Sequence, residues 1–514
     1  MQKKLFGIVE GFFSSPLPLW SNSERISIIQ LLAEQPSLIN AYLYCPKNDV
    51  YVTSEWATLY TQKNIKPIIK AARLCSRTNI NFYYGLNPTL TDFSERSSKN
   101  TARKIIKKLE QLRTLGIDSF CLLFDDIPFA YNILADEKSI RDAQAGAAQA
   151  IIANVVYDWL GNKPGALLVC SSEYFFTRKT KFLEAFDSTL KKDIPVLWTG
   201  SGVYEKNLGS STVVAAQNSI AAERPLIWWN NYPVNDCEHI PGTFHFGAFN
   251  GPPIKAFQKL DGIFVNPMRE AMLNIGVLAT FKQYLENPRQ YNRDRALRVV
   301  CTEKFGKAGR ALYRLGSSFA DKNTVDAEPR EYAKKILAVK TNEQLRIVYA
   351  SINADQKLIE AYKKNDADSA WGSFCLYIAM LLKPRIKAAM QVAQTNKAGF
   401  EKITEPLLRF PVVTEKRYLT KIYKTIMDRQ RMISAWQNFG NVALLNAISN
   451  LGILYGKYNG KNRLSISSSD EAMLRKNIKI TIRKQKELLV KYCLVADKIK
   501  KIKTLIRWWN MNGY

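Results

Sequence analysis

The chain has 514 residues, of which 46% are hydrophobic, and it carries 74 Lys and Arg against 45 Asp and Glu. This length allows two or three domains, and the hydrophobic share is ordinary for a protein that folds in water. The longest apolar stretch, residues 374–382, is too short to cross a bilayer. Residues 1–10 hold neither a long apolar core nor a cleavage site, so we expect a first strand instead of a signal peptide. A cytoplasmic location follows as an expectation, with signal-free export as an open alternative.

Histidine and cysteine usage argues against several kinds of chemistry. The two histidines, His239 and His245, fall in one short segment, which argues against a histidine-built zinc site and against a Ser-His-Asp triad. The eight cysteines are scattered without CxxC spacing, and Cys45, Cys121 and Cys170 lie in apolar runs. We therefore expect buried free thiols in a reducing compartment. We also expect no metal and no cofactor, with carboxylates as the acid–base catalysts.

The first part of the chain repeats one pattern eight times, in which a short apolar run is followed by a polar break and then a helical stretch. The runs span residues 5–13, 38–45, 81–88, 119–126, 166–175, 195–200, 225–231 and 262–267. Helix-like segments between them include residues 23–32, 101–115, 142–160 and 180–191. Eight such units over about 280 residues match an α/β fold of the (β/α)₈ TIM-barrel type. An open doubly wound sheet is the alternative, but it would not need eight repeats. We predict a barrel catalytic domain over residues 1–288.

The second part of the chain changes to long helical patterns and holds most of the basic charge. The helical stretches are residues 294–315, 329–365, 368–397, 416–457 and 470–509. Residues 1–290 carry 31 basic against 26 acidic side chains, a net charge of +5, whereas residues 291–514 carry 43 against 19, a net of +24. These patterns predict an all-α helical bundle domain over residues 289–514.

The last helical stretch allows two interpretations. Residues 475–507 hold twelve Lys and Arg and two acids, with apolar residues at helical spacing. The stretch can be a bundle helix whose apolar stripe is core and whose lysines are solvated. It can also form a patch for an anionic partner, which would be a nucleic acid, an anionic membrane or an acidic polymer. No nucleic-acid-binding motif accompanies it, which weakens the first of these partners.

Polar and aromatic residues collect where the predicted strands end, which is where barrels of this type place their active sites. Asp125 and Asp126 close the fourth run. The alternative is that one of them caps the next helix and the other is solvated. The remaining residues at strand ends are Lys47, Asn87, Glu173, Tyr174, residues 198–200, Trp229, Asn231 and Asn266. Carboxylates and amides bind hydroxyl groups directionally, and aromatic faces cover the apolar side of a pyranose, so this ring predicts a sugar site.

The adjacency of the two acids favours one kind of glycoside hydrolysis. Most glycosidases flank the scissile bond with two carboxyl groups that lie about 5 Å or more apart. Neighbours in sequence rarely reach opposite sides of that bond. Asp125 and Asp126 fit better if both act on the same side of the sugar and the substrate supplies the nucleophile.

Six segments of the first part resemble glycoside hydrolase family 84. They are Glu10-Gly-Phe-Phe13, Ala41-Tyr-Leu-Tyr-Cys-Pro-Lys47, Leu122-Leu-Phe-Asp-Asp-Ile127, Leu197-Trp-Thr-Gly200, Ile227-Trp-Trp-Asn-Asn-Tyr-Pro-Val-Asn-Asp236 and Val265-Asn-Pro267. That family holds β-N-acetylglucosaminidases that act as protein O-GlcNAcases, and some of its members are called hyaluronidases. The resemblance spans residues 5–288. It implies a retaining exo-β-N-acetylglucosaminidase whose substrate is a GlcNAc-bearing glycoprotein or glycoside.

The resemblance also implies a role for each matching residue. Asp125 would hold the N–H of the substrate's 2-acetamido group and stabilise an oxazolinium-like intermediate. Asp126 would protonate the leaving oxygen and then deprotonate the incoming water. Tyr174 and Asn231 would position the acetamido group, and Trp229 would help to form its pocket. The residues implied to bind sugar hydroxyls or to lie on the same ring are Gly11, Lys47, Asp236 and Asn266.

One departure from the family pattern keeps a second function class open. Phe13 stands where the family usually has Tyr, so a hydroxyl group near the pocket is missing. A protein that binds GlcNAc without turning it over is therefore an alternative. A third possibility is a barrel that only carries the basic helical domain, whose binding of anionic polymers or membranes would then be the main function.

Overall fold

The structure is a computed structural model that describes the first part of the chain almost throughout. The described residues are 4–13, 19–90, 93–125, 135–205, 207–221, 223–236, 245, 247–269 and 271–316, with a few positions between 347 and 358. The predicted bundle beyond residue 316 lies, apart from those positions, outside the described residues. None of the helices in the described ranges is both long and apolar enough to cross a membrane.

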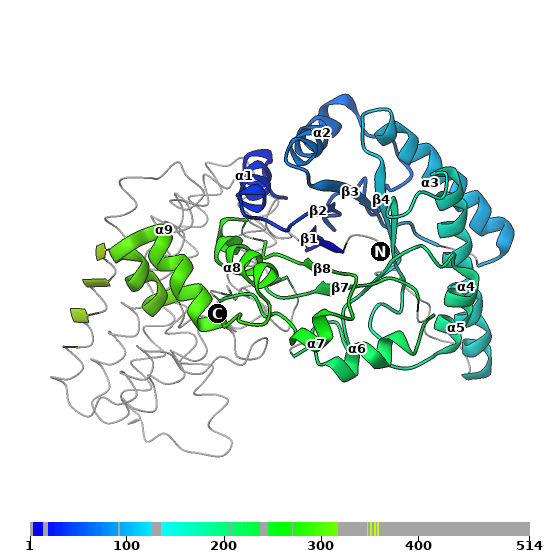
Figure 1. Ribbon diagram of the computed structural model, residues 1–514. Helices are drawn as coiled ribbons and strands as arrows, with labels where there is room; N and C mark the ends of the chain where they lie inside the picture. The colour runs from blue at the N-terminus through cyan, green and yellow to red at the C-terminus, as the bar shows by residue number, and fades with distance from the viewer. Residues whose placement is uncertain are drawn as a thin grey trace, which may run out of the picture.

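Eight parallel strands close into a barrel in which each strand pairs with its neighbours in chain order (Figure 1). The strands are β1 Leu5–Glu10, β2 Ala41–Tyr44, β3 Asn81–Leu86, β4 Ser119–Leu123, β5 Leu167–Cys170, β6 Val196–Trp198, β7 Leu226–Asn230 and β8 Gly262–Val265. Pairing of β1 with β8 closes the sheet. The predicted (β/α)₈ barrel is confirmed, and the doubly wound alternative is wrong. Each strand is shorter than its predicted run, because the last residues of each run leave the ladder and enter the loops.

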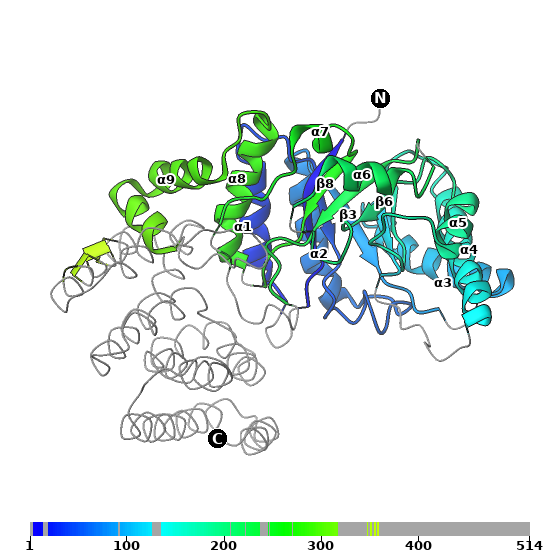
Figure 2. The same cartoon turned by 90° about the horizontal axis from the view of Figure 1, so that it is seen from below.

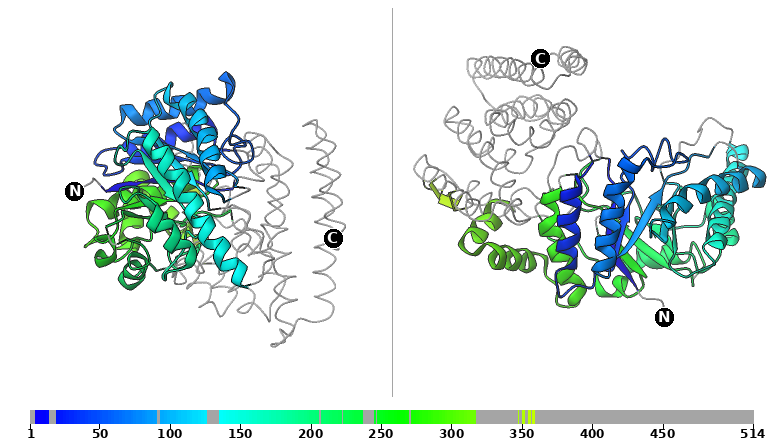
Figure 3. Two further views of the ribbon diagram at one scale, coloured as in Figure 1. Left: turned by 90° about the vertical axis from the view of Figure 1, so that its right-hand side faces the viewer. Right: turned by 90° about the horizontal axis from the view of Figure 1, so that it is seen from above.

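Helices follow the strands and surround the barrel (Figures 2 and 3). They are α1 Asn22–Ala33, α2 Gln62–Arg77, α3 Glu95–Arg113, α4 Ala135–Trp159, α5 Lys181–Thr189, α6 Ser210–Gln217, α7 Ile254–Phe257, the 3₁₀ turn η1 Ala271–Asn274, α8 Ile275–Glu286 and α9 Arg293–Gly316. On one flank α1 and α8 lie side by side, and α9 extends outward beyond α8. Four helices begin at a Ser or Thr whose hydroxyl accepts a hydrogen bond from the first turn, namely Ser21, Thr61, Ser94 and Thr180. These caps fix where the loops at the strand ends finish.

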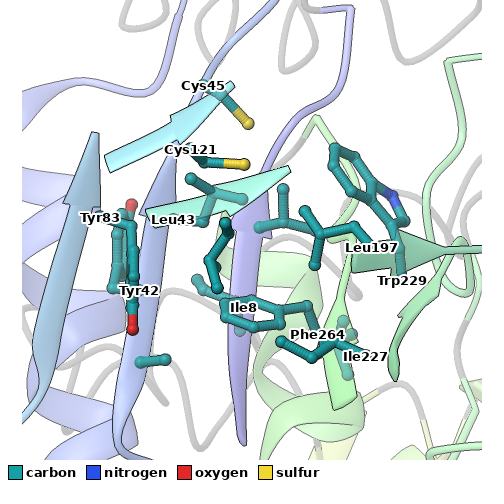
Figure 4. Close-up of a cluster of buried hydrophobic side chains, with 14 of the residues drawn as sticks. Ile8, Tyr42, Leu43, Cys45, Tyr83, Cys121, Leu197, Ile227, Trp229 and Phe264 are labelled. Atoms are coloured by element: carbon teal, nitrogen blue, oxygen red, sulfur yellow. The ribbon is translucent and has the colours of Figure 1, made fainter. Parts of the chain in front are cut away.

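Alternate residues of each strand fill the barrel interior (Figure 4). The rings of Tyr83 and Phe264 meet edge to face with centroids 6.5 Å apart, although their strands are not neighbours. On β4, Phe120 points the other way and packs against Trp159 of α4. Cys121 is buried in the interior, and burial raises the pKa of its thiol. Cys45, Cys121 and Cys170 are buried and form no disulfide within the described residues, as expected.

A buried ion pair joins the end of β1 to α1. Arg25 donates from Nε to Oε2 of Glu10 at 2.8 Å and from Nη2 to Oε1 at 2.6 Å. The Tyr42 hydroxyl on β2 donates to the same carboxylate at 2.6 Å. Glu10 and Arg25 are 0% and 3% exposed. Because neither charge reaches water, each depends on the other for compensation.

We expect the Arg25→Met variant to lower the free energy of unfolding by about 3–5 kcal/mol, because it leaves the Glu10 carboxylate buried without its cation. Chemical denaturation at neutral pH measures this loss. The matched control is Glu95→Gln, which breaks an i,i+4 pair with Lys99 whose side chains are 67% and 52% exposed. Equal unfolding midpoints for the two variants would show that the buried pair has no special weight.

Candidate active site

Three candidate side chains continue the inward phase of their strands past the strand ends. Lys47 lies two residues after the inward-facing Cys45, and Asp125 lies four residues after Cys121. The Lys47 Nζ atom is 2.6 Å from Asp125 Oδ2. Asn87, which follows β3, donates from Nδ2 to Asp125 Oδ1 at 3.1 Å. The loops after β2, β3 and β4 therefore meet at one carboxylate.

The Asp125 carboxylate is shielded from water and fixed in orientation. The side chains of Lys47 and Asp125 are only 4% and 9% exposed. An ammonium at this distance favours the ionised carboxylate, which acts as an acceptor only. Asn87 also donates to the Leu123 carbonyl at 2.8 Å, so its amide is held in place. Residues 126–134, between Asp125 and the described part of α4, lie outside the described residues, so the helix-cap alternative stays a prediction. Asp126 lies outside the described residues.

A second polar group joins the ends of β7 and β8. The Oδ1 atom of Asn231 accepts hydrogen bonds from Trp229 Nε1 at 2.8 Å and from Asn266 Nδ2 at 2.9 Å. The Nδ2 atom of Asn231 donates to the Val203 carbonyl at 2.7 Å. The Oδ1 atom of Asn266 is buried and has no hydrogen-bond partner among the described residues. The Asn231 side chain thus orients the indole, while Asn266 presents an acceptor that a ligand can use.

Gly11 and Asp236 connect the end of β1 to this group. A Cβ atom on Gly11 would lie 2.7 Å from Cζ2 of Trp229, so only glycine lets the indole pack here. The Asp236 Oδ2 atom accepts a hydrogen bond from the Phe13 backbone N–H at 2.6 Å. The Phe13 ring itself is 46% exposed. The residue that departs from the family pattern therefore lies on the surface beside Asp236.

Other residues of the predicted ring hold the loops at this edge. Tyr174 is half-buried after β5, its ring meets Phe175 edge to face, and its carbonyl accepts from the Thr199 N–H at 2.9 Å. The Thr199 hydroxyl donates to the Gly202 carbonyl at 2.8 Å. The Glu173 carboxylate accepts from Thr180, which caps α5. No group of His, Cys, Asp and Glu side chains suited to a metal ion occurs in the part of the chain that the structure describes.

The structure thus assembles two clusters from the predicted residues: Asp125 with Lys47, and Asn231 with Trp229 and Asn266. The sequence pattern predicted Asn87 at a strand end but not its hydrogen bond to Asp125. The signal was present, because Asn87 shares the inward phase of β3 with Tyr83. The hydrogen bond from Asn231 to the Val203 carbonyl could not be predicted, because every residue has a backbone carbonyl and the sequence does not show which one is used.

Comparison with known proteins identifies relatives of the barrel. A sequence model of the beta-N-acetylglucosaminidase family matches residues 6–316. The proteins called Protein O-GlcNAcase from Rattus norvegicus and from Mus musculus are each 29% identical over 309 residues, which are 58% of this chain and 31% of theirs. The chain therefore spans about a third of the length of these curated relatives.

Solved structures of other proteins share the fold. A mutant of the O-GlcNAc hydrolase of Thermobaculum terrenum superimposes with a TM-score of 0.63 and 22% identity, over 88% of this chain and 97% of that chain. The protein called CpGH84B superimposes with a TM-score of 0.56 and 19% identity, over 94% of this chain and 73% of that chain. At these identities the structural likeness concerns the fold alone.

We expect Gly11→Ala to lower the free energy of unfolding by about 1–3 kcal/mol, because the added methyl group overpacks against Trp229. Thermal unfolding followed by tryptophan fluorescence measures the loss. Gly209→Ala is the matched control, since the nearest atom to its new Cβ is 3.7 Å away. An unchanged melting temperature for Gly11→Ala would contradict the tight contact between β1 and the indole.

Proposed function

Because the chain belongs to the β-N-acetylglucosaminidase family, glycoside hydrolase family 84, we propose that it is a retaining exo-β-N-acetylglucosaminidase that uses the substrate's own 2-acetamido group as nucleophile. The observation that carries the proposal is Asp125, a buried carboxylate fixed by Lys47 and Asn87 at the carboxyl edge of the barrel. The names of the relatives favour O-linked GlcNAc on proteins as the substrate.

Asp125 would act on the substrate's acetamido group. Lys47 and Asn87 each contact one oxygen of the Asp125 carboxylate, and this carboxylate, as an acceptor of N–H groups, would also accept the acetamido N–H. That hydrogen bond increases the negative charge on the acetamido carbonyl oxygen. This oxygen then bonds to the anomeric carbon as the glycosidic bond breaks, and the positive charge of the resulting oxazolinium is stabilised by the carboxylate.

Asp126 would move the protons. As general acid it donates a proton to the leaving glycosidic oxygen, and as general base it then takes a proton from the water that opens the oxazolinium. Formation of the oxazolinium and its opening by water each invert the anomeric carbon. Two inversions give a product with the configuration of the substrate. This role rests on the family resemblance and on the adjacency of Asp126 to Asp125.

The second cluster would hold the rest of the sugar. The indole of Trp229, oriented by Asn231, would form an apolar wall for the acetamido group, and Tyr174 would position that group from the end of β5. The buried Oδ1 of Asn266 would accept a hydrogen bond from a sugar hydroxyl. Asp236 would bind another hydroxyl beside the backbone of Gly11.

We expect Asp125→Asn to lower kcat/KM for an aryl β-N-acetylglucosaminide by about 100-fold or more, because a neutral amide gives little stabilisation to the oxazolinium. The loss should be similar for good and poor leaving groups, since Asp125 does not protonate the aglycone. Release of the aryl alcohol measures both rates.

Asp118→Asn is the matched control, because Asp118 is exposed at the amino end of the same strand. Full activity of Asp125→Asn would refute its role in the mechanism. A wild-type protein that binds GlcNAc without releasing product would instead favour the binding-protein alternative.

A further inference from the structure

Asp49 is a buried carboxylate on the helix-facing side of the barrel, only two residues beyond Lys47. Asp49 is 8% exposed. The Oδ2 atom accepts hydrogen bonds from the hydroxyls of Tyr44 and Tyr60, both at 2.8 Å. The Oδ1 atom accepts from the Tyr51 backbone N–H at 3.0 Å. Asp49 thus fixes the loop after β2 through three donors, while Lys47 in the same loop reaches Asp125.

The donors to Asp49 are themselves held in place. Burial raises the pKa of Tyr44 and of Tyr60 above the ordinary range, so both phenols stay protonated and can donate. From α3, the Gln111 side chain accepts from the Tyr60 backbone N–H and donates to its carbonyl, both at 2.9 Å. The Lys108 Nζ atom lies 4.0 Å from the centre of the Tyr60 ring. Tyr60 is therefore a fixed point between α3 and Asp49.

The turn that begins at Asp49 also contacts the backbone of Asn87. The Val52 N–H donates to the Asp49 carbonyl at 3.0 Å. The Val52 carbonyl in turn accepts from the Asn87 backbone N–H at 2.8 Å. Asn87 is the residue whose side chain donates to Asp125. Lys47 and Asn87 are therefore both attached to backbone that Asp49 holds.

We propose that Asp49 is a positioning residue for the reaction, which holds Lys47 and Asn87 so that Asp125 faces the substrate's acetamido group. This inference rests on the proposed function. Asp49 acts through its neighbours in the loop and through the turn to Asn87. A small displacement of a catalytic group costs rate even when the fold is kept, so the effect belongs in kcat.

The test is the Asp49→Asn variant, whose amide nitrogen cannot accept from a phenol. We expect kcat to fall about tenfold or more with KM nearly unchanged, and to the same extent on aryl N-acetylglucosaminides with good and poor leaving groups. A double-mutant cycle with Lys47→Met adds a second readout. If Asp49 acts through Lys47, the double variant loses less than the product of the two single losses.

Tyr42→Phe is the matched control. Tyr42 lies on β2, as Tyr44 does, but its buried hydroxyl donates to Glu10 instead of Asp49. The control variant should lower the melting temperature and keep kcat per folded molecule. Unchanged kcat in Asp49→Asn, a loss confined to poor leaving groups, or independent effects in the cycle would overturn the inference. If Asp49→Asn does not fold, Tyr60→Phe must show the same leaving-group-independent loss of kcat, and its absence overturns the inference equally. A wild-type protein without hydrolysis would instead refute the proposed function.

Discussion

The contact between Lys47 and Asp125 is the interaction on which the arrangement of the site depends. A charged ammonium and a carboxylate 2.6 Å apart, both nearly excluded from water, persist only where the surrounding chain holds them together. Here the closed barrel brings the loops after β2, β3 and β4 to one edge, and the buried network around Asp49 fixes the loop that carries Lys47. The result is an oriented acceptor whose two oxygens are already partly occupied. Such a group needs little rearrangement when a substrate N–H arrives.

The repeat of apolar runs was enough to predict the barrel, because eight strands of a closed parallel sheet are buried on both faces and read as continuous apolar segments. The phase of each strand also predicts which side chains meet, since Lys47 and Asp125 continue the inward alternation of their strands. Strand lengths were predicted less well, because the residues that leave the ladder are as apolar as those inside it. Sequence alone also gave no indication that Tyr60 reaches Asp49, because that contact depends on how the loop after β2 packs on α3.

Four predictions rest on the sequence alone. Asp126 and most of the predicted bundle over residues 289–514 lie outside the described residues, so the second carboxylate keeps its role by resemblance. An anionic partner for the basic half and a cytoplasmic location stay predictions from the sequence. The family assignment, by contrast, rests on residues 6–316, which hold the barrel and α9.

The central claim is that the acetamido group of the substrate, held by Asp125, is the nucleophile. Aryl glycosides whose acetamido methyl carries one, two or three fluorines test it most directly, because each fluorine withdraws electrons from the attacking carbonyl oxygen. We predict that kcat falls steeply with each added fluorine in the wild-type protein. A kcat that does not change across the series would contradict it, since a nucleophile supplied by the protein would not respond to that substitution.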